Sequence, residues 1–233
     1  MQDRYAGDIG DFIKLGLLRA LSPDRKLGVV WYRFPDESHN GDGRHIGYLD
    51  QADRYAELDP SLFDHLKRVV ATERSIASLL PALDGAVSFD DSIDQSHLYH
   101  GLRRQGRADW MSRALLAVAD CDLVFADPDN GIVDDDERRK GRAKFGKHIP
   151  LREARALAEG RCAVIYHHNT RRKGGHDAEV EHWLAEIQSP TLAVRAKAYS
   201  PRTFFIVNPD EEVKARTEEF CKRWRCLQVH LHR

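Results

Sequence analysis

The chain has 233 residues, of which 42% are hydrophobic and 31% charged, as in a soluble globular protein with one sizeable core. Its formal net charge of −1 argues against binding of nucleic acid by bulk charge alone, and no apolar run approaches the ~18 residues of a membrane helix. We therefore expect a single cytoplasmic domain without a signal peptide, whose four cysteines are reduced and structural.

Hydrophobic periodicity predicts helices that alternate with strands along most of the chain. In chain order the pattern predicts a helix at 10–21, a strand at 27–34, two helical pieces at 61–83, a strand at 86–89, a helix at 110–119, a strand at 122–126, a helix at 150–159, a strand at 162–166, a helix at 177–187, strands at 191–198 and 203–207, a helix at 210–223 and a strand at 226–231. Such alternation implies an α/β fold with a mainly parallel sheet and crossovers on both faces. The closing strands, with little between them, indicate an antiparallel edge.

The clearest strand, 122–126, ends at a turn that reads Asp-Pro-Asp-Asn-Gly. In open parallel sheets, ligands bind beyond the carboxyl ends of the strands. The proline fixes the backbone so that side chains point outward, and a carboxylate beside an amide can bind an exocyclic amine or a ribose. The same residues can also form a plain Asn-Gly turn. Because the turn lies at a strand end, we predict that Asp127, Asp129 and Asn130 are catalytic.

Three further loops follow strands at the same predicted edge of the sheet. Residues 37–44 contain two glycines spaced by one residue, which let backbone approach a ligand closely, but they lack the third glycine of a dinucleotide fingerprint. An acidic run that includes Asp91 follows the strand 86–89, where nucleotide-binding sheets contact a ribose; a solvated acidic loop is the alternative. Adjacent His167 and His168 face opposite ways in an extended chain, so we expect no metal site there.

Basic residues concentrate in the connection that follows the Asp-Pro-Asp-Asn turn. They could track phosphates, with Phe145 available to stack on a base, although a charge run is often only a solvated face. We expect nucleic acid, RNA or DNA, as a partner of this segment. The basic residues concerned are Arg138, Arg139, Lys140, Arg142, Lys144 and Lys147.

Several short motifs, in order, resemble those of a known enzyme family. Residues 5–14 read Tyr-Ala-Gly-Asp-Ile-Gly-Asp-Phe-Ile-Lys, where the 23S ribosomal RNA adenine-N6 methyltransferases have the form His-Ala-Gly-Asn-His-Ala-Asp-Val-Leu-Lys. Residues 37–44 read Glu-Ser-His-Asn-Gly-Asp-Gly-Arg, similar to the family's Asp-Thr-His-Ala-Gly-Ala-Gly-Arg, and residues 204–209 resemble its late strand ending in Asn-Pro. The resemblance implies a Rossmann-like class I methyltransferase fold with a short N-terminal helical cap. Within the single domain, residues from about 50 to 84 are expected to form a helical insertion.

The same resemblance implies a cofactor, S-adenosylmethionine, and roles for individual residues. Lys14 would bind the methionine carboxylate, Asp91 or its neighbour the ribose, and Asp109 the adenine. Asp127 would orient the target amine and accept its hydrogen bond as the nitrogen attacks the methyl group. The residues implied to line the cofactor are Glu37, Ser38, His39, Gly41 and Gly43.

The chain departs from the family at the catalytic motif. The family pattern is Asp-Pro-Pro-Tyr, whose aromatic stacks on the target base, whereas Asp129 and Asn130 stand in the last two places here. Stacking worth ~1–3 kcal/mol per base is therefore absent at this position. Phe145 or His148, in the next loop, would have to supply it.

The leading hypothesis is a class I methyltransferase-like enzyme that acts on an amine of a nucleic-acid base. A second hypothesis is a metal-dependent hydrolase of nucleic acid or a nucleotide, with Asp127, Asp129, Asp91 and a histidine around a divalent ion. A third is a non-catalytic nucleotide-binding module with a methyltransferase fold. The fold alone does not decide among the three, because the site carries the function.

Overall fold

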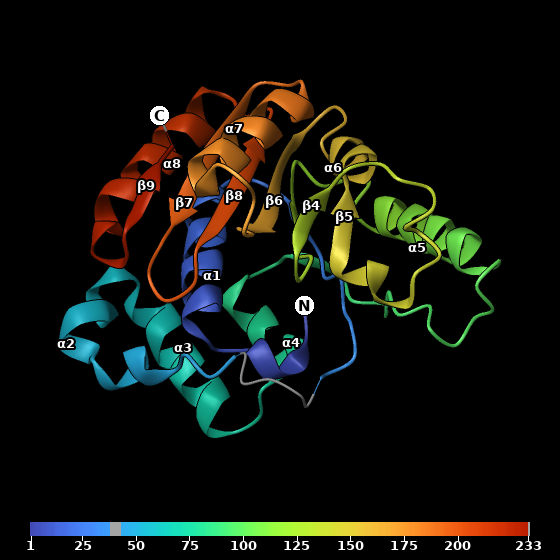
Figure 1. The fold of residues 1–233 in the computed structure, drawn as a ribbon. Helices are drawn as coiled ribbons and strands as arrows, with labels where there is room; N and C mark the ends of the chain where they lie inside the picture. The colour runs from blue at the N-terminus through green and yellow to red at the C-terminus, as the bar shows by residue number, and fades with distance from the viewer. Residues whose placement is uncertain (38–42, 233) are drawn as a thin grey trace.

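The computed structural model describes residues 1–37 and 43–232. The helices are α1 (Ile9–Leu21), α2 (Ala52–Tyr55), α3 (Pro60–Ala71), α4 (Ile76–Leu79), α5 (Arg103–Ala117), α6 (Leu151–Leu157), α7 (Gly175–Ile187) and α8 (Glu211–Arg223). The strands are β1 (Leu27–Val30), β2 (Val87–Phe89), β3 (Leu123–Ala126), β4 (Gly131–Val133), β5 (His148–Pro150), β6 (Cys162–His168), β7 (Thr191–Ala196), β8 (Arg202–Val207) and β9 (Val229–Leu231). Figure 1 shows the sheet between two layers of helices.

Within the described residues, a seven-stranded sheet has the order β2-β1-β3-β6-β8-β7-β9. The first four strands in this order are mutually parallel. Strand β8 runs antiparallel to both β6 and β7, and β9 runs antiparallel to β7. The predicted α/β class, with a mainly parallel sheet and an antiparallel edge, is therefore confirmed.

The central strands are apolar on both faces because helices cover both sides of the sheet. Successive side chains of a strand point to opposite faces, so Leu123 and Phe125 pack against α1, α3 and α8, whereas Val124 and Ala126 pack against α5, α6 and α7. This burial explains why β3 reads as a continuous hydrophobic run. The helices α2, α3 and α4 lie within the predicted helical insertion, beside α1 (Figure 1).

Several local features differ from the sequence-based expectation. Strand β1 ends at Val30, four residues before the predicted end at Phe34, and β9 begins at Val229, three residues after the predicted start at Cys226. Helix α5 begins at Arg103, seven residues before the predicted start at Trp110, because its first turns are polar and carry no apolar stripe. Strands β4 and β5 form a separate two-stranded parallel ladder where a turn and a polar connection were expected. Each is three residues long, too short for a periodic pattern to reveal.

No helix within residues 1–37 and 43–232 combines the length and the apolar composition needed to span a membrane.

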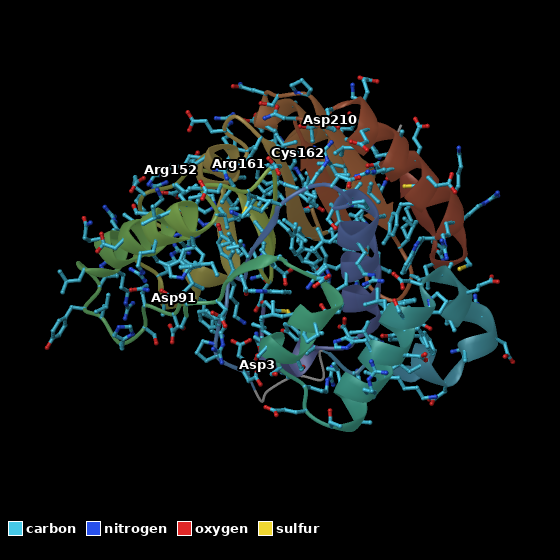
Figure 2. All side chains as sticks on the ribbon, turned by 180° about the vertical axis from the view of Figure 1, so that it is seen from behind. Asp3, Asp91, Arg152, Arg161, Cys162 and Asp210 are labelled. Carbon is cyan, nitrogen blue, oxygen red and sulfur yellow. The ribbon has the colours of Figure 1, made fainter. Side chains whose placement is uncertain are left out.

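The N-terminal segment lies against the carboxyl edge of the sheet, because the carbonyl of Asp127, just past β3, accepts a hydrogen bond from the Met1 ammonium. In Figure 2, Asp3 and Cys162, the first residue of β6, lie toward opposite ends of the molecule.

Candidate functional site

A cavity of about 240 Å³ opens at the carboxyl ends of β3 and β6. This place adjoins the point between β1 and β3 where the strand order reverses, the usual ligand site of open α/β sheets. The volume is below the ~300–1,000 Å³ of pockets that enclose a whole drug-sized ligand, so the cavity suits one polar end of a larger molecule. Its lining residues are Met1, Tyr5, Asp8, Gly10, Asp11, Lys14, Gly43, His45, Asp127, Pro128, Asp129, Asn130, Tyr166, His168, Ser200 and Arg202.

The centre of the cavity is a buried ion network on Lys14. Its Nζ lies 2.7 Å from Asp11 Oδ1, one turn earlier on α1, and 2.7 Å from Asp127 Oδ2. All three side chains are at most 6% exposed. Burial raises the pKa of Asp11 and of Asp127, and one ammonium shared between two carboxylates only partly offsets that effect. The two carboxylates outweigh the desolvation of the amine and raise the pKa of Lys14, which stays charged.

The two residues after Pro128 are held by different partners. The Asp129 carboxylate pairs with the Met1 ammonium, accepts a hydrogen bond from Gln2 Nε2 at 2.9 Å and lies 3.9 Å from Lys147 Nζ. Asn130 Nδ2 lies 3.2 Å from His148 Nε2. Burial, and to a lesser extent nearby arginines, lower the pKa of His148 to about 4, so the neutral ring accepts this bond at neutral pH.

The shape of the turn depends on a buried histidine behind it. Ile132 N–H donates to His167 Nδ1 at 3.0 Å, so Nδ1 is unprotonated and Nε2–H donates to Glu179 Oε1 at 3.2 Å. Gly131 has φ +87°, and a Cβ on it would lie 2.5 Å from His167 Nδ1, so only glycine fits. Glu179 also accepts from Thr170 N and Oγ1, at 2.8 and 2.6 Å. His167 thus supports the turn, whereas its neighbour His168 lines the cavity.

We expect Glu179→Gln to destabilise the fold by about 1–3 kcal/mol at pH 7, because a buried charged acceptor is lost. Burial opposes the charged carboxylate, but hydrogen bonds from His167 and Thr170 outweigh it and lower the pKa of Glu179 to about 2. A depressed folded pKa contributes stability above about pH 4.5 that is lost as pH falls toward 2. Urea unfolding at pH 7 and pH 3 should therefore show a smaller difference from wild type at pH 3. Glu181→Gln, on the exposed face of the same helix, is the control, and an equal loss in both variants would contradict this role.

Three of the loop residues expected to line the cofactor, Ser38, His39 and Gly41, lie outside the described residues. Gly43 lines the cavity, and its carbonyl accepts a hydrogen bond from Arg74 Nη2 at 2.6 Å.

Glu37, the first residue of that loop, binds basic side chains instead of the cavity. It pairs with Lys147 and lies 3.3 Å from Lys144 Nζ. The hydrogen bond from Lys147 is the main reason that the pKa of Glu37 falls to about 2. This ion pair ties the loop after β1 to the segment before β5.

The structure does not bring Asp91 or Asp109 to the cavity. Asp91 Oδ2 lies 3.1 Å from Arg113 Nε on α5, and its carbonyl accepts a hydrogen bond from the indole of Trp110. Asp109 lies on the exposed face of α5 and accepts from Gln105 Nε2 at 2.8 Å. Position after a strand therefore did not bring the Asp91 side chain to this cavity, where it would be needed for the predicted ribose contact, because it lies against an arginine of the neighbouring helix. The set proposed for a divalent ion is not assembled, and no group of three or more metal-binding side chains occurs in residues 1–37 and 43–232.

Most basic side chains of the segment after the turn form ion pairs with nearby carboxylates. Arg138 pairs with Asp136, Lys140 with Glu137, and both Lys144 and Lys147 with Glu37. Among the described residues, no carboxylate lies within ion-pair distance of the two remaining members, Arg139 and Arg142. The segment is thus less positive than its sequence indicates.

Sequence reasoning missed Arg202 and Tyr166, which both line the cavity. Tyr166 is the fifth residue of β6, inside the strand where the prediction placed its end. Arg202 begins β8, and because β8 is antiparallel its amino end meets the carboxyl ends of the parallel strands. The predicted antiparallel edge was the signal that could have located Arg202.

Comparison with known proteins adds no relative. Neither a scan against models of protein families nor a search of curated proteins finds a match for this chain.

Proposed function

We propose that this protein is a class I methyltransferase-like enzyme of the cytoplasm that uses S-adenosylmethionine to methylate an amine of a nucleic-acid base. The observation that carries the proposal is the charge of the cavity. Four aspartates line it, against two basic side chains and the Met1 ammonium. S-adenosylmethionine has a sulfonium, an ammonium and one carboxylate, so its net charge is positive. It therefore complements a cavity that is acidic overall but also has basic groups to pair with the carboxylate. The four aspartates are Asp8, Asp11, Asp127 and Asp129.

The arrangement of the sheet supports the same proposal. The resemblance implies a class I sheet with an antiparallel edge, and here β8 is inserted in reverse between β6 and β7. The Asp-Pro-Asp-Asn turn follows β3 at the ligand edge, where the family has its catalytic motif. Asp127 would accept a hydrogen bond from the target amine and orient its lone pair toward the methyl group.

A base could stack on Tyr166 rather than on Phe145. Phe145 is 4% exposed and covered by the Arg107 guanidinium, 4.8 Å from the ring centroid, so it is not open to a base. Tyr166 is partly exposed, lines the cavity and packs edge-on against Phe204. Burial raises the pKa of Tyr166 to about 12, which keeps the phenol neutral beside a nucleobase. Arg139 and Arg142 remain the cations available to nucleic-acid phosphates.

Calorimetry with S-adenosylmethionine and S-adenosylhomocysteine tests the proposal. We expect binding of both, followed by transfer of a labelled methyl group to RNA or DNA fragments. An absence of heat at millimolar ligand would remove the cofactor from the proposal. Binding without methyl transfer to any nucleic acid would instead favour a non-catalytic module. Cleavage of nucleic acid or a nucleotide that requires magnesium and does not need S-adenosylmethionine would favour the hydrolase.

A further inference from the structure

Arg202 is a buried cation in the cavity whose charge is not neutralised by an ion pair. It is 4% exposed and lines the cavity from the amino end of β8. Its Nε donates to the Ser200 carbonyl at 3.1 Å, which fixes the side chain by one edge of the guanidinium. Among residues 1–37 and 43–232, no carboxylate lies within 4.0 Å of its nitrogens. A buried charge of this kind is costly unless something pairs with it.

The position of the guanidinium indicates what pairs with it. Its Nη1 lies over the first turn of α1, so close that a Cβ on Gly10 would be 2.1 Å away. A helix amino end favours negative charge, and the guanidinium adds donors in a fork that fits a carboxylate. Asp8 also lies beside Gly10, with Oδ1 2.9 Å from the same Cβ position, and it caps α1 by accepting from Asp11 N at 3.0 Å instead of pairing with the arginine. An anion beside Gly10 would therefore meet both the arginine and the positive end of the helix.

Lys14, the other basic side chain of the cavity, is occupied. It is shared between two carboxylates at 2.7 Å each, and its third N–H faces Met1 Sδ at 3.8 Å. A ligand carboxylate would have to replace that sulfur and would lie beside two carboxylates that already hold the ammonium. We propose that Arg202, and not Lys14, binds the carboxylate of the ligand's amino-acid end. This inference rests on the proposed function and reverses the role that the family resemblance implies for Lys14.

The test compares S-adenosylhomocysteine with its decarboxylated analogue, 5′-(3-aminopropylthio)-5′-deoxyadenosine, by calorimetry. Wild type should bind S-adenosylhomocysteine at least about tenfold more tightly, as expected for a charge-assisted hydrogen-bonded pair. In Arg202→Gln this preference should disappear through weaker binding of S-adenosylhomocysteine alone. Gly10→Ala is a second variant, since alanine suits a helix and its Cβ displaces the guanidinium; it should reduce the preference in a chain that still folds.

The control is Arg195→Gln, a buried arginine on the adjacent strand β7 that pairs with Asp177 outside the cavity. It should keep the full preference. If Lys14→Gln loses the preference while Arg202→Gln keeps it, Arg202 is not the carboxylate site and the cofactor proposal still stands.

A second measurement separates the two proposals if neither nucleoside binds. Acetate and inorganic phosphate are titrated while the Arg202 Nε–H resonance, assigned by its absence in Arg202→Gln, is followed by NMR. A saturable shift absent from Gly10→Ala would retain Arg202 as an anion site and reject S-adenosylmethionine as the ligand. No shift with either anion would reject both.

Discussion

Asp127→Asn is expected to lower the rate of methyl transfer by about 10²–10⁴-fold while S-adenosylmethionine affinity stays within a few-fold. The carboxylate is 2% exposed at the carboxyl end of β3, where it can accept a hydrogen bond from an amine as positive charge develops on nitrogen. Asparagine keeps the size and one acceptor for Lys14, and Lys14 keeps its bond to Asp11. Single-turnover transfer of a labelled methyl group, with cofactor affinity measured in parallel, gives both quantities.

Asp120→Asn is the control, because its carboxylate is 89% exposed and lies outside the lining of the cavity. Its transfer rate should equal that of wild type. If Asp127→Asn lost cofactor binding and thermal stability together with the rate, the residue would be structural and its proposed contact with the amine would have to be abandoned.

Lys14→Met is expected to have the largest effect on stability, about 3–5 kcal/mol at pH 7.5, because it leaves two buried carboxylates without their cation. Burial already raises the pKa of Asp11 and of Asp127, and loss of the ammonium raises both further. Carboxyls with raised folded pKa values bind protons more readily in the folded state, so the variant gains stability as pH falls. Urea unfolding should give a smaller deficit at pH 5 than at pH 7.5.

Lys140→Met is the matched control. Its side chain is 3% exposed, but its partner Glu137 is 56% exposed and can be solvated once the lysine is gone. It should cost much less than Lys14→Met and show no such recovery at pH 5. Equal losses with the same pH dependence would mean that Lys14 contributes as packing and not as the shared cation.

The predicted elements that agree best with the structure are those whose buried residues form a clear apolar pattern in the sequence. Helix α1 has an apolar stripe and strand β3 a continuous apolar run, and both were located to within a residue or two. The start of α5 has no such pattern, because its early turns are held by an ion pair of Arg107 with Glu153, at 2.8 Å. That contact joins residues far apart in sequence, so local periodicity cannot reveal it.

The candidate site was predictable in its location but not in its pairing. The strand-end rule located Asp127 at the cavity, yet its partner Lys14 lies 113 residues away, and only the folded chain joins them. The same rule did not bring Asp91 to the cavity, since it locates the backbone after a strand and not the direction of the side chain, which here lies against Arg113. The rule could not locate Arg202, because Arg202 is the first residue of an antiparallel strand.

The β4–β5 ladder has a consequence for how this chain can change. Gly131 to Val133 pair in parallel with His148 to Pro150, so the excursion between them leaves the ladder at Val133 and returns at His148, opposite Gly131. His167 holds Ile132 just after the Asp-Pro-Asp-Asn turn, and Lys147, at the end of the excursion, lies 3.9 Å from Asp129. Under the proposed function, we expect substitutions or length changes in the outer part of the excursion to alter target preference, while these contacts and the ladder hold the turn.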